Sequence, residues 1–483
     1  MSISGQQAFM DHGVQTSLRE SYLVTGAHFA IATNSEEILA ATRNSFRQVV
    51  ETETSPAVTM RLWVDPAARS FPPWPHPYFR GLGHLAYAGF DSENSLVVDL
   101  RCRRVVGRFS PPMARDEGYW RQVIFPTIVG FLSDALDITV LHCACAERDG
   151  SGLLLAGESG SGKSTLSLAM ARSGFAFLSD DWTYLSGAGS ELAAWGLVTP
   201  LKLLPDAVKY FPELRSLEPG VAMNGERCYE VDPEGVFGIR RSLRCEPRWL
   251  VFLERRQKPG HSFVRMSPGE AAARLESALS RLPAELSQLE EIQRATIRSL
   301  VERECWLLRH GENPHDIAHV LVRLCAGSPQ RVPQGLTSEG TVNFVRTGPD
   351  NTRRLTPTPY VADLCASGHA IRLQTNSPMI RGQVTKALDR HGQTQMSEEP
   401  FLWRLVSDDN SGLRPPWPDF RSLSADGLHL TNIGQRSFLA VDREGRCAIG
   451  FVAEDLLKDE IGSEAFLARL LSMTFGGLLE TTA

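Results

Sequence analysis

Hydrophobic residues near the start of the chain follow a mixture of helical and strand spacing. From Ser35 to Val50 the apolar positions recur every three or four residues, and Ser35 can cap the amino end of a helix. Short apolar runs around this stretch have the composition of strands. We expect helices over 35–50 and 119–136 and strands over 28–32, 58–64, 96–100 and 104–109, the last two as a hairpin.

The middle of the chain contains more continuous apolar runs, which are typical of strands buried on both faces. Gly174 suits the left-handed cap of a helix that ends just before it. Ser267, Pro268 and Glu270 form a capping box, after which helical spacing dominates as far as Cys325. We expect strands over 139–144, 152–156, 175–178, 195–198 and 249–253.

Two stretches lack a regular pattern. Residues 1–22 are polar and are expected to form a flexible or loosely docked arm. Residues from about 326 to 360 are rich in Pro, Gly and Thr, which predicts a linker, with one short strand over 341–345.

The C-terminal part of the chain repeats the N-terminal part at a nearly constant offset. The strongest match is Pro72-Pro73-Trp74-Pro75 with Pro415-Pro416-Trp417-Pro418. Further matches in register pair 33–35 with 375–377, 61–62 with 404–405, 98–99 with 441–442 and 106–107 with 449–450. We therefore predict two copies of one module on either side of a single central domain, rather than a solenoid with many repeats.

Composition restricts the class of protein. A chain of 483 residues with 42% hydrophobic and 22% charged residues is typical of a globular protein of two to four domains. The formal charge of -6 argues against a nucleic-acid partner or a polybasic membrane surface. Nine scattered cysteines and no visible signal peptide or membrane-spanning run lead us to expect a reduced, cytoplasmic setting.

One glycine-rich stretch carries a specific chemical signal. An apolar strand, 152–156, runs into a loop of the form G-x-x-x-x-G-K-[ST], and a helix follows. Glycines let the backbone turn tightly and direct its N–H groups at phosphate oxygens, and the helix start adds positive potential. The stretch consists of Gly157, Glu158, Ser159, Gly160, Ser161, Gly162, Lys163, Ser164 and Thr165. It predicts a nucleotide site in which Lys163 contacts ATP phosphates and Ser164 binds Mg²⁺.

An acidic pair follows one helix and one strand later. Asp180 and Asp181 end the predicted strand 175–178, at the edge where such sheets place active groups. One carboxylate can bind Mg²⁺ while the other accepts a proton from an attacking hydroxyl. An Asx turn is the alternative interpretation. His142, on the preceding strand, reads by itself as a hydrogen-bonded core histidine.

Several other polar residues are candidates for phosphate or substrate contacts. Residues 229–233 and Glu254-Arg255-Arg256 fall into this class, since an arginine at a strand end can stabilise a transferring phosphoryl group. Arg240, Arg241 and Arg244 lie nearby in sequence, and we interpret them as a solvated face.

Together, His142, the loop 157–165 and Asp180-Asp181 resemble the catalytic domain of HPr kinase/phosphorylase and its related serine kinases, of the HPr kinase/PEP carboxykinase type. The resemblance covers about residues 139–185. It implies that Lys163 and Ser164 bind ATP and Mg²⁺, that His142 belongs to the active site, and that the Asp pair is catalytic. We assign Asp180 as the base and Asp181, with Ser164, as the metal-side residue.

The chain also departs from that family. No Glu-Arg-Gly-Leu-Gly-type segment occurs between Ala193 and Glu246, which leaves phosphorylase activity and recognition of HPr without support. The N-terminal module does not resemble that of the bifunctional enzymes.

These observations lead to one expected fold and a leading function. The fold is α/β, with residues 1–22 as an arm, 23–138 and 363–483 as mixed α+β accessory modules, 139–328 as a P-loop kinase domain and 329–362 as a linker. The expected function is transfer of the γ-phosphate of ATP to a hydroxyl of a protein or peptide serine. A small-metabolite kinase and a nucleotide-binding regulatory or scaffold protein remain alternatives. A homo-oligomer is compatible with all three.

Overall fold

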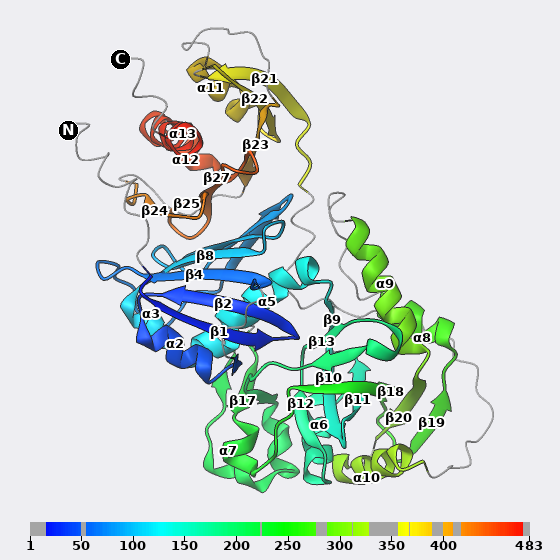
Figure 1. Cartoon of the computed structure of the whole chain (residues 1–483). Coiled ribbons are helices and arrows are strands. Elements are labelled where there is room, and N and C mark those ends of the chain that lie inside the picture. Colours follow the sequence, from blue (N-terminus) through cyan, green and yellow to red (C-terminus); the bar gives the residue numbers. More distant parts are fainter. Residues whose placement is uncertain are drawn as a thin grey trace.

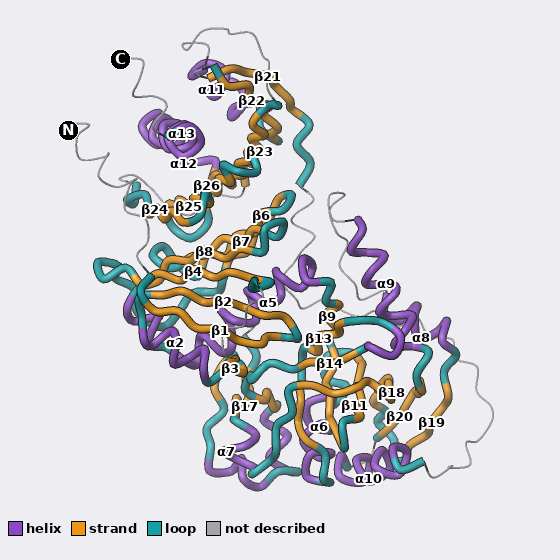
Figure 2. The backbone as a smooth tube through the Cα atoms, in the orientation of Figure 1, coloured by secondary structure: helices purple, strands orange, loops and turns teal. Residues whose placement is uncertain are grey.

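The computed structural model describes residues 16–49, 55–222, 225–276, 287–311, 313–327, 356–366, 368–388, 399–408 and 417–476. These residues form 8-stranded, 9-stranded and 7-stranded sheets, with a smaller 3-stranded sheet, and helices pack on them (Figures 1 and 2). Parallel and antiparallel pairs occur together in the large sheets, so the expected α/β class is confirmed. Among the described residues no helix is both long and apolar enough to cross a membrane.

Residues 18–136 build the first of these sheets and are called here the N-terminal module. Its strand order is β3-β1-β2-β4-β8-β7-β6-β5. The strands are β1 (Leu18–Val24), β2 (Ala27–Thr33), β3 (Arg47–Val49), β4 (Val58–Val64), β5 (Tyr78–Leu82), β6 (Leu85–Gly89), β7 (Ser95–Asp99) and β8 (Arg104–Phe109). The helical segments are α2 (Glu36–Arg43), α3 (Pro111–Arg115), α4 (Glu117–Tyr119), η1 (Trp120–Ile124), α5 (Phe125–Ser133) and η2 (Asp134–Leu136).

Most local expectations for this module are confirmed, and two are wrong. Ser35 caps α2, since its Oγ accepts a hydrogen bond from the Ile38 N–H at 3.3 Å. That helix ends at Arg43 instead of Val50, because residues 47–49 pair with β1 as a strand. The predicted arm is wrong for residues 18–22, because these residues belong to β1 and pair with residues 29–33 of β2.

The C-terminal module, residues 360–476, repeats this architecture with the strand order β21-β22-β23-β27-β26-β25-β24. Its strands are β21 (Tyr360–Ala366), β22 (His369–Thr375), β23 (Phe401–Asp408), β24 (Arg421–Ala425), β25 (Leu428–Ile433), β26 (Ser437–Asp442) and β27 (Cys447–Ala453), and its helices are α11 (Pro378–Leu388), α12 (Glu454–Lys458) and α13 (Glu460–Phe475). Strand β21 starts at Tyr360, so the linker expected over 329–362 ends three residues too late. The strand predicted over 341–345 lies outside the described residues.

Individual hydrogen bonds are also repeated between the two modules. The Asn34 side-chain amide donates to the Val64 carbonyl oxygen and accepts from the Val64 N–H. The Asn376 side chain makes the same two hydrogen bonds with the backbone of Ser407. The Trp74 indole N–H donates to Asp116 at 2.7 Å, and that of Trp417 donates to Asp459 at 2.8 Å. These contacts are made by residues that the sequence repeat pairs with one another.

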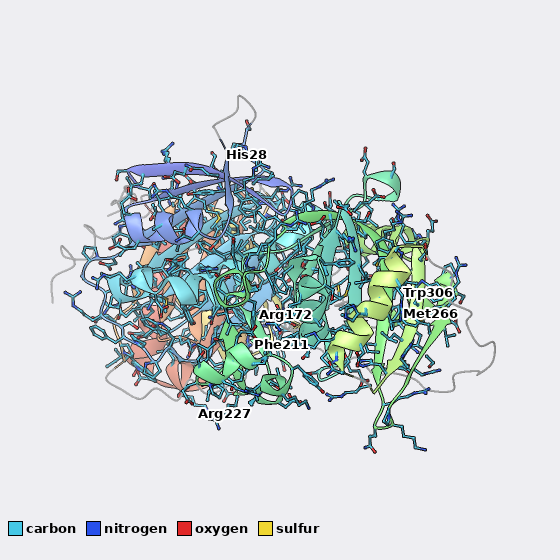
Figure 3. The ribbon with its side chains drawn as sticks, turned by 90° about the horizontal axis from the view of Figure 1, so that it is seen from below. His28, Arg172, Phe211, Arg227, Met266 and Trp306 are labelled. Carbon is cyan, nitrogen blue, oxygen red and sulfur yellow. The ribbon has the colours of Figure 1, made fainter. Side chains whose placement is uncertain are left out.

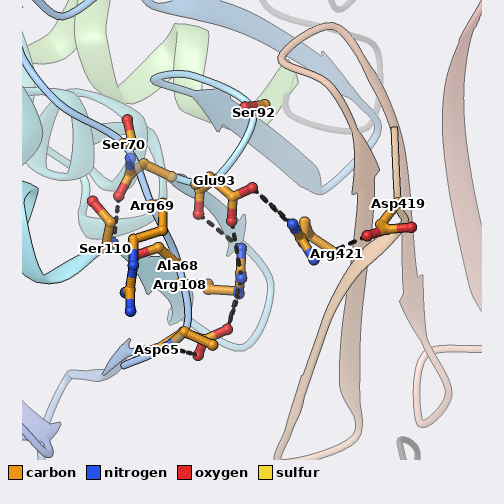
Figure 4. A network of polar contacts seen from close by, with 12 residues as sticks. Asp65, Ala68, Arg69, Ser70, Ser92, Glu93, Arg108, Ser110, Asp419 and Arg421 are labelled. Carbon is orange, nitrogen blue, oxygen red and sulfur yellow. Dashed lines mark hydrogen bonds and ion pairs between the residues drawn. The ribbon is translucent and has the colours of Figure 1, made fainter. Parts of the chain in front are cut away.

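The two modules pack against each other through one shared apolar core. This core combines strands β5 to β8 with β23 to β27, and Tyr87 stacks on Phe438 with ring centroids 3.9 Å apart. A chain of ion pairs crosses the same interface. Arg108 binds Asp65 and Glu93, and Glu93 also pairs with Arg421 of the C-terminal module at 3.0 Å (Figure 4). The modules are therefore joined by both apolar and ionic contacts.

The central region, residues 139–327, holds the 9-stranded sheet. Its main path is β12-β10-β11-β18-β14-β13-β9, and β20 joins β18 and β19. The strands are β9 (Thr139–Leu141), β10 (Cys143–Arg148), β11 (Ser151–Gly157), β12 (Ala176–Ser179), β13 (Thr183–Ser186), β14 (Ala193–Trp195), β18 (Arg244–Arg255), β19 (His261–Arg265) and β20 (Glu304–His310). The small sheet contains β15 (Leu201–Leu203), β16 (Gly220–Val221) and β17 (Arg227–Val231).

Helices cover both faces of the central sheet. They are α6 (Lys163–Arg172), α7 (Pro233–Phe237), α8 (Pro268–Glu276), α9 (Ser287–Val301) and α10 (Pro314–Cys325), with short 3-10 turns η3 (Gly189–Glu191), η4 (Pro205–Lys209) and η5 (Pro212–Ser216). Helices α6 and α10 belong to one core, and α8 and α9 to the other. In Figure 3, Arg172 of α6 and Phe211 lie close together, and the Arg172 guanidinium lies over the Phe211 ring at 5.2 Å from its centroid.

Two strand predictions and one helix prediction for this region need correction. The expected strand 139–144 is broken at His142, because β9 pairs with β13 whereas β10 pairs with β11 and β12. The strand expected at 195–198 is β14, which ends at Trp195. Residues 304–310, expected to be helical, form β20, a strand parallel to β18. The capping box is confirmed, since Ser267 and Glu270 exchange hydrogen bonds at the start of α8.

Candidate phosphoryl-transfer site

The glycine-rich loop connects the end of β11 to the start of α6, as the sequence predicts. Gly160 and Gly162 have φ angles of +78° and +96°, a region that residues with a Cβ rarely adopt. A Cβ at Gly157 would lie 2.7 Å from Ser161 Oγ and 2.9 Å from the Leu253 carbonyl oxygen. The loop therefore needs glycine both for its conformation and for its close packing.

Lys163 occupies the first turn of α6 and is buried, with an exposed fraction of 7%. Its Nζ donates to the carbonyl oxygens of Gly157 at 2.8 Å and Glu158 at 3.1 Å. Burial lowers the pKa of Lys163, and the negative charges of Asp181 and Asp180 act in the opposite direction. The ammonium group thus lies within the loop and within the field of the acidic pair.

Asp180 follows β12 and is almost completely buried, with an exposed fraction of 5%. Its Oδ2 accepts a hydrogen bond from the backbone N–H of Lys202 in β15 at 3.0 Å. Burial and the neighbouring charge of Asp181 raise the pKa of Asp180 to about 7. Such a carboxyl group can exchange a proton near neutral pH.

Asp181 differs from its neighbour, because its side chain is 45% exposed and its Oδ1 lies 2.8 Å from Nε2 of His142. Partial burial alone would raise the pKa of Asp181, but the hydrogen bond and charge of His142 hold it below the ordinary value. The His142 ring also packs on Trp182, with ring centroids 5.2 Å apart. Asp181 is therefore an ionised carboxylate held in position by an oriented histidine.

Topology explains why these residues meet. Strands β11, β12, β18 and β20 run in the same direction, so their carboxyl ends lie at one edge of the sheet. Strand β10 runs the opposite way, which brings His142 to that edge. The Thr183 hydroxyl donates to the Cys143 carbonyl oxygen at 2.9 Å and lies 2.6 Å from the Ser179 hydroxyl. These bonds fix the turn that carries the acidic pair.

The loop residues suit a nucleotide phosphate and Mg²⁺. Ser164 and Thr165 are half-buried in the first turn of α6, and Glu158, Ser159 and Gly160 are exposed. Gly160 has no atom within 4 Å of an added Cβ, so the loop leaves space at this point. The cationic Lys163, the Ser164 hydroxyl and the Asp181 carboxylate supply donors and hard oxygen ligands of the kind that Mg-phosphate groups prefer.

Two of the other polar residues singled out in the sequence, Glu254 and Arg241, form ion pairs within the protein. Glu254 pairs with Arg309 at 2.8 Å and with Arg274 at 3.3 Å. Arg241, expected on a solvated face, has a side chain only 11% exposed, and it pairs with Asp232 at 3.0 Å because the turn before β18 packs on the end of β17. The side chain of Arg240 is 70% exposed, as expected.

Sequence reasoning misses three residues of the site: Lys202, Trp182 and His310. Lys202 comes from the separate small sheet, and no spacing rule connects it to Asp180. The ring of Trp182 follows the acidic pair directly and reads as core. His310 is the last residue of β20, a strand in a part of the sequence where helical spacing is expected. A buried parallel strand ending in polar residues is the one signal that could have identified it.

Comparisons with known proteins add little to this geometry. No protein-family model matches the chain, and no curated protein matches it. Among solved structures, the chain is similar to the Hpr(Ser) kinase/phosphatase from Coxiella burnetii, with 15% identity and a TM-score of 0.22, over 39% of this chain and 96% of the other. At this identity and TM-score, the similarity carries no functional argument.

Proposed function

We propose that this protein is an ATP-dependent phosphotransferase that moves the γ-phosphate to a hydroxyl group, specifically a serine of a protein or peptide. The supporting observation is the difference between two adjacent carboxyl groups beside the phosphate loop. Asp180 has a pKa of about 7, while His142 holds the pKa of Asp181 low. Environments that separate the acidities of two neighbouring groups are typical of acid–base sites.

In this proposal each side chain has one role. The Asp180 carboxylate accepts the proton of the acceptor hydroxyl while that oxygen bonds to phosphorus and the bond from phosphorus to the ADP oxygen breaks. Lys163 and the loop N–H groups hold the phosphates. His142 orients Asp181, which with Ser164 would hold Mg²⁺, and the ion would neutralise phosphate charge.

The acceptor class is supported by the small sheet next to Asp180. Lys202 donates its backbone N–H to Asp180, and its own side chain is 46% exposed. Leu204, which follows β15, and Val221 of β16 are 39% and 75% exposed, so apolar side chains of this region are open to contact with an acceptor. Such a surface suits a peptide better than a free amino acid.

Transfer of labelled phosphate from ATP tests the proposal, with soluble extract, synthetic serine peptides and free serine as acceptors. Asp180→Asn should reduce transfer by about a hundredfold or more and leave nucleotide binding nearly intact. Lys163→Ala should abolish ATP turnover. Asp206→Asn is the matched control, because Asp206 is an exposed carboxylate paired with Lys209.

Parental transfer by Asp180→Asn would refute its role as base. Slow ATP hydrolysis without any phosphorylated acceptor would instead support a regulatory nucleotide-binding protein. Labelling of free serine in preference to peptides would move the acceptor class to small metabolites.

A further inference from the structure

His310 is the last residue of β20 and lies beside the phosphate loop, far from it in sequence. Its Nε2 is 3.2 Å from the Ser161 carbonyl oxygen, and its exposed fraction is 8%. A carbonyl oxygen can only accept a hydrogen bond, so Nε2 must carry the proton in this contact. The imidazole therefore donates to the backbone of the loop.

The backbone of His310 is itself held firmly. Its carbonyl oxygen accepts from the Arg256 N–H at 2.7 Å, and the residue pairs with β18 on one side and with β19 on the other. A donor fixed in this way can hold the adjoining loop in one position.

Ser161 lies between the two glycines with positive φ, Gly160 and Gly162. In a planar trans peptide the C=O and the N–H point in opposite directions. Holding the Ser161 carbonyl oxygen toward His310 therefore turns the Gly162 N–H away from it. The imidazole also fills the space beside Gly162, since its Cε1 lies 3.7 Å from the place of an added Cβ.

We infer that His310 is a positioning residue for the phosphate loop, which sets the orientation of the Gly162 N–H for binding nucleotide phosphate. This inference rests on the proposed function, since it concerns the same site. His310 acts through the loop and takes no part in proton transfer.

A pair of amide substitutions tests the inference. Glutamine places its N–H₂ near the position of a histidine Nε2, whereas asparagine places it near that of Nδ1, too short to reach the Ser161 oxygen. His310→Asn should weaken the binding of ADP and of a non-hydrolysable ATP analogue by about fivefold, the effect of one lost hydrogen bond. His310→Gln should stay within about twofold of the parental affinity.

The control is His315→Phe in α10, because Nε2 of His315 also contacts a backbone carbonyl oxygen, that of Tyr210, at 3.1 Å. This contact lies outside the loop, so nucleotide affinity should not change. Calorimetry gives the affinities, and melting without nucleotide shows that each variant is folded. A KM for ATP that rises in His310→Asn at unchanged kcat supports positioning over catalysis.

Two outcomes overturn the inference: parental affinity in His310→Asn, or equal weakening in the Asn and Gln variants. If the parental protein binds nucleotide but the His310 variants do not show the expected affinities, the role of His310 is refuted and the proposed function is not. If the parental protein binds no nucleotide, the proposed function fails with it.

Discussion

Asp180 and Asp181 are neighbours in sequence, yet their surroundings give them opposite acid strengths. Asp180 is enclosed in the protein and contacts one backbone N–H, whereas Asp181 is half exposed and paired with His142. The desolvated group is the weaker acid and the paired group is the stronger one. This arrangement places a weakly acidic carboxyl group and an ionised carboxylate within one dipeptide.

Under the proposed function, the rate of phosphoryl transfer should depend on the ionisation of Asp180. A base must be deprotonated to act, and the pKa of Asp180 is about 7. We therefore expect kcat/KM to rise about tenfold for each pH unit below 7 and to level off above it. Measurement of kcat/KM from pH 5 to 9 checks this. A profile that is flat through pH 7 would contradict the assignment.

Asp180 should also make the folded protein less stable at high pH. Its folded-state pKa is raised above 3.8, so the folded state binds the proton more tightly than the unfolded state does. The stability that this proton provides is present below pH 4 and is lost as pH rises through 7. The change in the free energy of unfolding caused by Asp180→Asn should therefore be more favourable at pH 8 than at pH 4, by on the order of 2–4 kcal/mol. Urea unfolding of both proteins at the two pH values measures this difference.

The sequence identifies the residues of the candidate site better than it identifies the side chains that contact them. The spacing of Lys163, Ser164 and the acidic pair is local, so it is visible in the chain. The contact of His142 with Asp181 depends on strands β9 and β13 lying side by side, which no local pattern encodes. The same holds for Lys202 and His310, which reach the site from other strands.

Elements with a strong local signal are predicted well. The helix caps at Ser35 and Ser267, the hairpin of β7 and β8 and the strand β11 are all found in the structure. Strands β3 and β20 are missed because their formation depends on a distant neighbour, β1 and β18 respectively. Tertiary pairing there overrides local spacing.

The turn between β11 and α6 should tolerate no side chain at its first glycine. Gly157→Ala brings a methyl group into contact with Ser161 and with the backbone of β18, which should cost about 1–3 kcal/mol. Gly269→Ala is the matched control, because Gly269 lies in α8 with open space around it. That variant should be stabilised by about 0.5–1 kcal/mol. Urea unfolding distinguishes the two, and equal effects would contradict the packing argument.

On the scale of the whole molecule, the N-terminal module lies between the other two parts (Figure 1). It shares an apolar core with the C-terminal module and another with the central region, where Tyr184 and Leu197 join its cluster. Trp182, which packs on His142, also contacts this cluster. The N-terminal module thus packs against Trp182, the residue on which the His142 ring of the candidate site lies.

The ionic contacts between the modules should contribute to stability. Asp442 is fully buried, and it binds His84 at 3.2 Å and Arg101 at 2.9 Å, both from the N-terminal module. Although burial would raise it, these partners lower the pKa of Asp442 to about 2. Asp442→Asn should therefore destabilise the protein by about 2 kcal/mol at pH 7.

This contribution of Asp442 is present above pH 4 and is lost as pH falls through 2, so the two proteins should converge in acid. Asp363→Asn is the control, because its ion pair with Arg372 is exposed and lies within one module. Unfolding curves that show equal effects for the two substitutions would argue against an ionic link between the modules.

The two modules contact each other through equivalent strands, as two identical subunits of a dimer would, but both belong to one chain. In a dimer of identical chains, every substitution appears on both sides of the contact. Here the acids Asp99 and Asp442 occupy equivalent positions, whereas Arg101, Arg104 and His84 are replaced at the equivalent places by Glu444, Cys447 and Gly427. Because the two copies lie in one chain, a substitution changes only one side of the contact, and the charges on its two sides can therefore differ.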